Sequence, residues 1–279
     1  MSKTTVDLFR LDGKTAVITG GAGLLGTKHA EAIAEMGGIP VLLDTDKGRL
    51  DDRVAELEKK FGQGPLGFAV DITNADEMGR VVSEIIRQRG GIDVLINNAA
   101  MTVESSLGKS GYFAPFEEYE VSLWEQALSV SLTGAFIVTQ AVGRHMKERR
   151  MGAVLNIASD VGVFSPDHRI YRPDPATDYP GVPFNTPLSY SVAKAGLISM
   201  TRYLATYWAD YNIRVNALSP GGVHTNQSEG FVKRLTQLIP LGRMASSDEY
   251  KGAVVFLVSD ASAYLTGFNI VMNGGRVAW

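Results

Sequence analysis

Short apolar runs alternate along the chain with longer segments of helical character. Each run is bounded by turn residues, which is typical of a buried strand. We expect strands at residues 15–19, 39–43, 66–70, 94–96, 153–157, 213–218 and 269–272. The expected helices lie between them, at residues 27–36, 47–61, 76–89, 122–146, 189–211 and 248–258. This alternation predicts βαβ units, and hence a doubly wound α/β fold whose parallel sheet of about seven strands is covered by helices on both faces.

The chain contains no internal repeat, low-complexity segment or linker, so we expect one domain spanning residues 1–279. Its most irregular stretch lies between Ser159 and Tyr190, where the sequence is polar and rich in proline. We treat residues 163–187 as an inserted loop. A loop of this length inside a compact domain is usually functional or disordered.

A glycine-rich turn follows the first expected strand and precedes the first expected helix. Gly21, Gly23 and Gly26 fit the spacing G-x-G-x-x-G in the strand–turn–helix context that a dinucleotide-binding turn requires. The glycines allow backbone N–H groups to approach a pyrophosphate at the helix N-terminus. The alternative is a glycine turn without a ligand, but the context favours a bound dinucleotide.

Asp44 ends the second expected strand, 18 positions after Gly26. An acidic residue about 20 positions beyond such a turn accepts hydrogen bonds from the adenosine ribose. Its charge repels a 2′-phosphate, so Asp44 favours NAD over NADP. The alternative is that Asp44 or Asp46 caps the following helix, and Lys47 and Arg49 nearby leave NADP open.

Tyr190 and Lys194 stand four residues apart at the start of an expected helix. This spacing puts both side chains on one helix face, with Cβ atoms roughly 5–6 Å apart. An ammonium group beside a phenol favours the phenolate and lowers the phenol pKa from about 10. The pair is therefore suited to general acid–base catalysis. The alternative is a half-buried tyrosine beside a surface lysine.

Composition narrows the class of protein. The chain is 45% hydrophobic and 20% charged, with a net charge of −3 and a pI of about 5.9. This balance argues against a nucleic-acid surface. Residues 1–12 lack the apolar core of a signal peptide, and no apolar run approaches the ~18 residues that would span a bilayer. We expect a cytoplasmic protein without a membrane partner.

Cysteine and histidine usage argues against disulfide, thiol and metal chemistry. The chain has no cysteine. Its four histidines include no pair with the spacing of metal ligands, so we expect no metal site. They are His29, His145, His168 and His224.

The landmarks together resemble the short-chain dehydrogenase/reductase family over nearly the whole chain. Six motifs occur in the family's order and at the ends of expected strands: Thr19-Gly20 with its glycine turn, Asp71, Asn97-Asn98-Ala99, Ser159, Tyr190 with Lys194, and Pro220 to Thr225, followed by the terminal Gly274-Gly275. The resemblance implies a Rossmann fold and an NAD(P)-dependent oxidoreductase. It implies that Tyr190 is the catalytic acid/base, that Lys194 holds the nicotinamide ribose, and that Ser159 orients the substrate.

The resemblance also implies a set of cofactor-binding residues along the carboxyl edge of the sheet. Asp71 and Ile72 are expected at the adenine, while Val223 and Thr225 are expected at the nicotinamide carboxamide. The other expected contacts, besides Asp44, Tyr190 and Lys194, are Gly20, Gly23, Leu24, Leu25, Gly26, Asn98, Ala99, Ala100, Pro220 and Gly221.

Three departures from the family pattern affect the expected site. Leu24 stands where the middle glycine of the common short-chain turn would be, a register similar to the family's extended branch. Ser131 stands in place of the asparagine of the catalytic tetrad, and its hydroxyl could hold a relay water but offers no amide carbonyl. Ser159 and Tyr190 are 31 positions apart, more than the usual gap. The turn and the insertion are similar to those of oxidoreductases of surface-sugar and flagellin-glycan pathways.

The insertion at residues 163–187 is anchored at both ends beside the expected catalytic residues. Arginine presents a planar fork suited to phosphate, so we expect Arg169 and Arg172 to contact a polar substrate from a lid over the site. The alternative is a surface loop that packs on a neighbouring subunit, with its arginines paired to the loop's own aspartates.

The function expected from these features is an NAD-dependent interconversion of a secondary alcohol and a ketone. The expected substrate is a sugar, a sugar phosphate, a nucleotide sugar or a polyol. One alternative is a lipid-like or steroid substrate, and another is a protein that senses NAD without turnover. The helix expected at residues 189–211 is apolar on all sides. Burial within one subunit would explain this, but family resemblance favours a homodimer or homotetramer.

Overall fold

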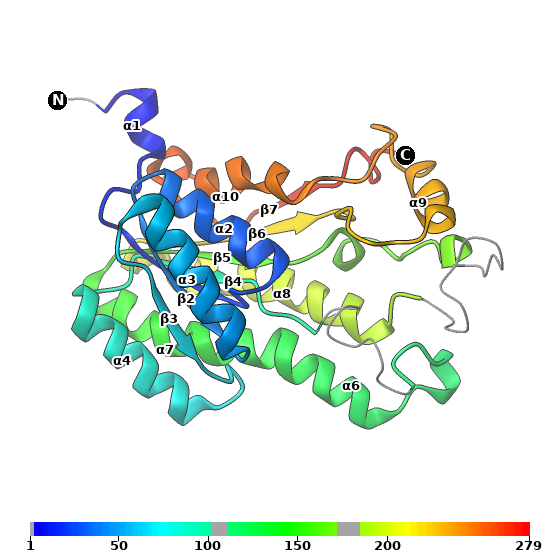
Figure 1. Cartoon of the computed structure of the whole chain (residues 1–279), viewed down its shortest axis with the longest axis horizontal. Helices are drawn as coiled ribbons and strands as arrows, with labels where there is room; N and C mark the ends of the chain where they lie inside the picture. The colour runs from blue at the N-terminus through cyan, green and yellow to red at the C-terminus, as the bar shows by residue number, and fades with distance from the viewer. Residues whose placement is uncertain (1–2, 102–110, 172–184) are drawn as a thin grey trace.

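The computed structural model describes residues 3–101, 111–171 and 185–279 (Figure 1). In this part of the chain seven parallel strands form one sheet in the order β3-β2-β1-β4-β5-β6-β7. The strand order reverses between β1 and β4, which is where ligands bind in open α/β sheets. The strands are β1 (Thr15–Thr19), β2 (Ile39–Asp44), β3 (Leu66–Ala69), β4 (Val94–Asn97), β5 (Gly152–Ile157), β6 (Ile213–Pro220) and β7 (Asn269–Met272).

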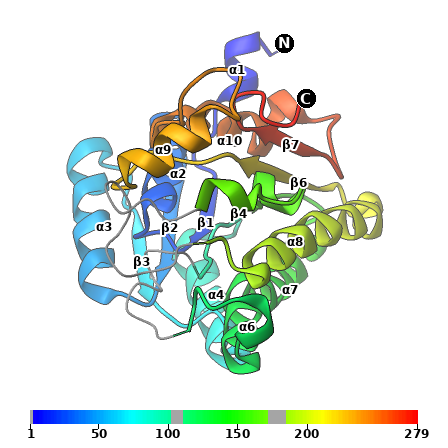
Figure 2. The ribbon, with the colours of Figure 1, turned by 90° about the vertical axis from the view of Figure 1, so that its right-hand side faces the viewer.

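Helices cover both faces of the sheet, so the expected doubly wound Rossmann-like fold is confirmed (Figure 2). One face is covered by α2 (Leu24–Glu35), α3 (Lys47–Phe61) and α10 (Lys251–Val258). The other face is covered by α4 (Ala75–Arg89), α7 (Gly134–Arg149) and α8 (Leu188–Tyr207).

Strand β1 illustrates why the central strands are apolar on both sides. Ile18 packs in the core under α2, α3 and α10, whereas its neighbour Val17 packs in the core under α4, α7 and α8. Successive side chains of a strand point to opposite faces, so both sets must be apolar when both faces are covered. All five residues of β1 are accordingly buried.

The helix expected at residues 122–146 is interrupted. It comprises α6 (Val121–Leu128), one π-helical turn (Ser129–Thr133) and then α7. Apolar periodicity continues across the turn, so the sequence pattern does not reveal it. Such π-turns occur frequently at functional sites, and this one contains Ser131.

Several short elements were not expected. The N-terminal helix α1 (Thr5–Phe9) is held by a capping box between Thr4 and Asp7, and α9 (Glu229–Thr236) is capped by Ser228. Inside the stretch expected to be irregular, 3₁₀ turns form at Asp160–Gly162 and His168–Tyr171. The expected helix at residues 189–211 instead ends at Tyr207 and continues as a 3₁₀ turn (Ala209–Tyr211).

The expectation that no apolar segment approaches the length needed to span a bilayer is wrong for the helical segment Val121–Arg149. It is long and apolar enough to cross a membrane by length and composition, with a mean hydropathy of 1.3 over its most apolar window. Core helices meet the same criterion, and Val138, Val142 and Met146 of α7 pack fully buried on the sheet. Only 28% of that window is buried, so much of this apolar helix faces outward.

Candidate active site

Helix α8 carries the Tyr190–Lys194 pair expected from the sequence. The Lys194 side chain is 2% exposed, and its Nζ donates a hydrogen bond of 2.7 Å to the carbonyl oxygen of Ile157. The same Nζ lies 5.6 Å from the centre of the Tyr190 ring. Burial lowers the pKa of Lys194 to about 8, which leaves it mostly charged at neutral pH. A fixed ammonium therefore lies beside the Tyr190 ring.

Ser159 follows β5 directly and is also buried. Because Lys194 is bonded to Ile157, two residues before Ser159, the end of β5 and the start of α8 are held together. Gly162 allows this approach: a Cβ there would lie 2.8–2.9 Å from the backbone of Lys194 and Ala195. The sequence analysis did not identify Gly162, since its role depends on a contact between distant segments.

The glycine turn leaves no room for side chains. Gly20 has φ of +61°, and a Cβ on Gly26 would lie 2.0 Å from the carbonyl oxygen of Gly20. Gly23 is the N-cap of α2 and provides no side-chain cap. The first backbone N–H groups of a helix lack intrahelical partners and suit an anion. Leu24 is half exposed at this helix end, and Leu25 packs against the core.

Residues after β4 hold the glycine turn in place. The hydroxyl oxygen of Thr19 accepts hydrogen bonds from the backbone N–H groups of Asn98 and Ala99, each 3.0 Å long. The Asn98 amide donates to the carbonyl oxygens of Thr19 and Gly20. Asn98 thus shapes the expected cofactor site through its side chain, two positions before Ala100 in the chain.

Ser131 lies in the π-turn and is buried. Its hydroxyl oxygen accepts a 3.0 Å hydrogen bond from the backbone N–H of Met101. Ser131 therefore fixes the segment that follows Ala100. A role for its hydroxyl in proton relay stays a prediction.

Asp44 faces the glycine turn at the end of β2. Its carboxylate accepts a 3.0 Å hydrogen bond from the backbone N–H of Ala22 and a 3.2 Å bond from that of Asp46. Asp46 is the residue that caps α3, by accepting from Arg49 N–H. The alternative that Asp44 caps this helix is therefore wrong, while capping by Asp46 is confirmed.

Asp71 and Ile72, the two residues expected at the adenine, differ in what their side chains contact. The Asp71 carboxylate accepts hydrogen bonds from the backbone and hydroxyl of Thr73. The Ile72 side chain is buried in the core against Gly134. Ile72 can therefore meet a ligand only through its backbone.

In the segment after β6, the side-chain amide of Gln227 binds the backbone groups that are expected to bind the nicotinamide carboxamide. Gly221 packs so closely on Asn273 that a Cβ would lie 2.8 Å from it, which fixes the chain after Pro220. The Gln227 side chain accepts a 2.7 Å hydrogen bond from Thr225 N–H and donates one of 2.9 Å to Val223 O. A primary amide has the same donor and acceptor pattern as the nicotinamide carboxamide. These backbone groups therefore fit the cofactor.

The described ends of the insertion pack on α9. Ile170 is buried against Leu235 and Ile239, and the Tyr171 ring stacks on that of Phe231 at 5.7 Å. Arg169 is largely exposed and forms a bidentate pair with Asp167. Its contact with a substrate stays a prediction, and Arg172 lies outside the described residues.

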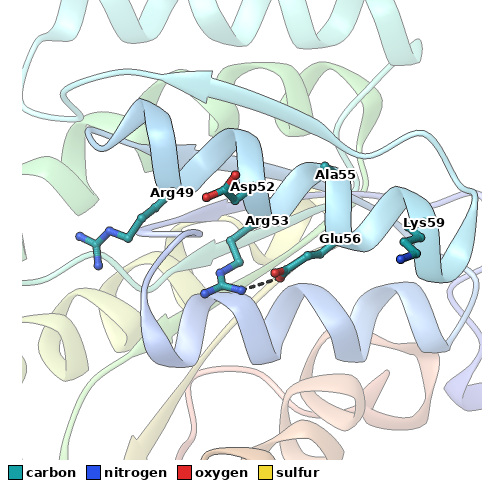
Figure 3. Close-up of a pocket in the computed structure, with 6 residues that line it drawn as sticks. All are labelled: Arg49, Asp52, Arg53, Ala55, Glu56 and Lys59. Carbon is teal, nitrogen blue, oxygen red and sulfur yellow. Dashed lines mark hydrogen bonds and ion pairs between the residues drawn. The ribbon is translucent and has the colours of Figure 1, made fainter.

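Two further observations concern metal-ligating groups and a surface hollow among the described residues. No group of three or more histidine, aspartate or glutamate side chains there could hold a metal ion. A hollow on the outer face of α3 is lined by charged side chains, among which Arg53 bonds to Glu56 (Figure 3). It is a surface groove along one helix, formed by residues other than those of the site above.

Comparison with known proteins identifies the family. A family model described as short chain dehydrogenase matches residues 14–171, and one described as enoyl-(acyl carrier protein) reductase matches residues 180–276. An NADP-dependent mannitol dehydrogenase of Aureobasidium melanogenum is 35% identical over 283 residues, which cover 98% of this chain and 96% of that protein. An NAD-dependent glycerol dehydrogenase of Listeria innocua is 32% identical over 272 residues, with 96% and 95% covered.

A solved structure agrees over the same length. The gluconate 5-dehydrogenase from Burkholderia cenocepacia, in complex with NADP and tartrate, matches with a TM-score of 0.85 and 27% identity, covering 99% of this chain and 100% of that one. The buried Ser159 and Lys194, the Tyr190 ring beside Lys194 and the glycine cradle are consistent with these matches. The chain belongs to the short-chain dehydrogenase/reductase family and is an NAD(P)-dependent oxidoreductase.

Proposed function

We propose that this enzyme interconverts a secondary alcohol and a ketone on a polyol or sugar-derived substrate, with NAD as cofactor and Tyr190 as general acid/base. The observation that carries the proposal is the buried Lys194 ammonium, held by Ile157 O beside the Tyr190 ring and next to Ser159.

In alcohol oxidation, Tyr190 takes the proton from the substrate hydroxyl. The Lys194 charge favours the phenolate form of Tyr190, which makes the phenol oxygen a base near neutral pH. Ser159 hydrogen-bonds the same substrate oxygen and holds it at Tyr190. The bound nicotinamide would accept the hydride from the alcohol carbon. In ketone reduction the proton returns from Tyr190 to the substrate oxygen.

The choice of NAD is supported by the position of Asp44. Its carboxylate bonds to Ala22 N–H inside the glycine turn and is not used as a helix cap. The nearby cations Arg49 and Lys47 form ion pairs with Asp46 and Asp51. Each therefore already has an acidic partner in place of a 2′-phosphate. An unpaired carboxylate beside the ribose would repel that phosphate.

The substrate class is supported by the names of relatives. Mannitol, glycerol and gluconate dehydrogenases are all polyhydroxylated-substrate enzymes by name. The rival class, acyl chains on a carrier protein, is favoured by the description of the family model over residues 180–276.

We also propose a symmetric homo-oligomer, a dimer or tetramer, formed through the outer face of α6, α7 and α8. Tyr203 and Tyr207 of α8 are exposed, and their rings stack at 5.9 Å. Phe136 of α7 is exposed too, in a helical segment that is apolar but mostly unburied. A second copy would remove this apolar surface from water.

The first prediction concerns Tyr190→Phe, which removes the phenol oxygen but keeps the ring. We expect kcat on the best polyol of a substrate panel to fall by ~10²–10⁴-fold, because the general acid/base is lost. NAD binding, followed by isothermal titration calorimetry, should stay within about twofold, as binding needs no proton transfer. The control Tyr264→Phe, at a fully exposed tyrosine, should leave both unchanged. Near-normal turnover of Tyr190→Phe would contradict the mechanism.

The second prediction concerns cofactor choice. We expect kcat/KM to be at least ~10-fold higher with NAD than with NADP, equivalent to about 1.4 kcal/mol. Asp44→Asn removes the charge and should narrow this preference. Asp46→Asn, which removes a charge two residues away but keeps a capping side chain, should not. The account of Asp44 is wrong if the wild-type enzyme uses both cofactors equally.

The third prediction concerns assembly. Light scattering at micromolar concentration should give the mass of a dimer or tetramer. The double variant Tyr203→Glu, Tyr207→Glu should lower that mass, since two charges in an apolar interface are costly to desolvate. Tyr264→Glu lies outside this face and serves as the control. A wild-type protein that is only monomeric would exclude the proposed oligomer.

A further inference from the structure

A buried ion pair lies directly behind Ser159. The Asp160 carboxylate and the Arg276 guanidinium are 4% and 8% exposed, and Arg276 Nη1 lies 3.4 Å from Asp160 Oδ2. Arg276 comes from the segment after β7, 116 positions away in sequence. The family motifs in the sequence include neither residue.

The two oxygens of Asp160 have different neighbours. Oδ2 faces Arg276, whereas Oδ1 lies 3.4 Å from Ser159 Oγ, whose hydroxyl donates to it. A serine hydroxyl has one proton and two acceptor lone pairs. The contact with Asp160 holds the Ser159 oxygen in one place, from which the same proton can turn to the substrate oxygen and leave the substrate's own proton for Tyr190. The carboxylate can thus set the position of the Ser159 hydroxyl.

Arg276 is itself fixed by its surroundings. Its guanidinium carbon lies 4.9 Å from the centre of the Phe164 ring, at the start of the insertion. Gly274 and Gly275, with φ of +68° and +89°, turn the chain immediately before it. Arg276 therefore joins the C-terminal segment, the insertion and the residue beside Ser159. Its Nη2 is buried without a hydrogen-bond partner in the described part of the chain.

Stability alone does not account for such a pair. Taking two charges out of water costs free energy that their mutual attraction often fails to exceed, and apolar residues of similar volume often stabilise a protein as well. An unpaired carboxylate at this position would also oppose negative charge on the Tyr190 oxygen and the substrate oxygen. Arg276 cancels that charge while leaving Asp160 able to accept a hydrogen bond from Ser159.

We propose that Asp160 and Arg276 form a positioning pair for the reaction, in which Asp160 orients the Ser159 hydroxyl and Arg276 keeps Asp160 ionised and its charge balanced. The inference rests on the proposed role of Ser159 in catalysis. Neither residue touches the reacting atoms. The pair is specific to the chemistry of this chain, because a neutral residue after Ser159 would need no partner from the C-terminal segment.

The other titratable groups near Asp160 do not replace Arg276. Burial raises the pKa of Asp160, and the Arg276 charge opposes this rise. The phenols of Tyr171 and Tyr250 also sense the carboxylate, but burial raises their pKa values, that of Tyr250 to about 12, so both are neutral near pH 7. Lys194 of α8 donates its hydrogen bond to the carbonyl oxygen of Ile157, and its charge lies beside the Tyr190 ring.

The test uses Arg276→Gln, Asp160→Asn and the double variant, assayed on the best polyol found with NAD. We expect Arg276→Gln to lower kcat by ~10–100-fold, the size of a small misplacement of catalytic groups. The double variant should recover most of this loss, because it removes the uncompensated charge. NAD affinity by calorimetry should stay within about twofold in all three. Arg243→Gln, at an exposed pair with Glu249 away from the site, is the matched control.

The pH profile separates positioning from a purely structural role. Without Arg276 the Asp160 pKa rises further, so the acid limb of kcat in Arg276→Gln should move upward by about one unit or more. The double variant should keep the wild-type limb, which Tyr190 governs, because asparagine does not titrate. If Arg276→Gln lowers only the melting temperature and leaves kcat and its pH profile unchanged, the proposal is overturned.

Two further variants keep the test decisive. Should Arg276→Gln fail to fold, Arg276→Lys keeps the charge and should retain both the wild-type kcat and its acid limb, whereas Asp160→Asn removes the carboxylate and should lower kcat with the Tyr190 limb in place; the opposite pattern overturns the proposal. A failure of the proposed function is recognised separately, because Tyr190→Phe would then remain active. In that case kcat effects at Arg276 would no longer report on Ser159.

Discussion

The site depends on one buried hydrogen bond, from the Lys194 ammonium to the carbonyl oxygen of Ile157. Burial disfavours the charged form and lowers the pKa of Lys194 to about 8, yet the charge survives at neutral pH. The bond holds α8 against the end of β5, so Tyr190 and Ser159 both lie at the carboxyl edge of the sheet. In the proposed mechanism, electrostatic activation of Tyr190 and orientation of the substrate would both follow from this contact.

The cofactor half of the site is built on close backbone approach. Gly26 must lack a Cβ because the Gly20 carbonyl occupies that space, and Asn98 ties the turn to β4. At the other end, the Gln227 amide lies on the groups of Val223 and Thr225 that suit a carboxamide. In the proposed complex the nicotinamide carboxamide would replace the Gln227 amide at these groups.

The local sequence pattern predicted most of the fold, because the spacing of apolar residues that identifies a strand or a helix involves only residues close together in the chain. The bounds of β1, α3 and β7 agree with the expectation from the sequence. The Tyr190–Lys194 pair was predictable for the same reason, since a four-residue spacing defines one helix face. The π-turn at Ser129–Thr133 was not, because it changes hydrogen bonding without changing the apolar pattern. The Asp160–Arg276 pair joins residues 116 positions apart, one after β5 and one after β7, and nothing local to either residue indicates the contact.

The most direct test of this account is the pH dependence of kcat for polyol oxidation by the wild-type enzyme and by Lys194→Met. Methionine fills the buried site without a charge. The account predicts that kcat falls by at least ~10²-fold and that the pKa governing its rise with pH moves upward by more than about one unit, toward the ~10 of a free phenol. Turnover and a pH profile equal to those of the wild type would contradict it.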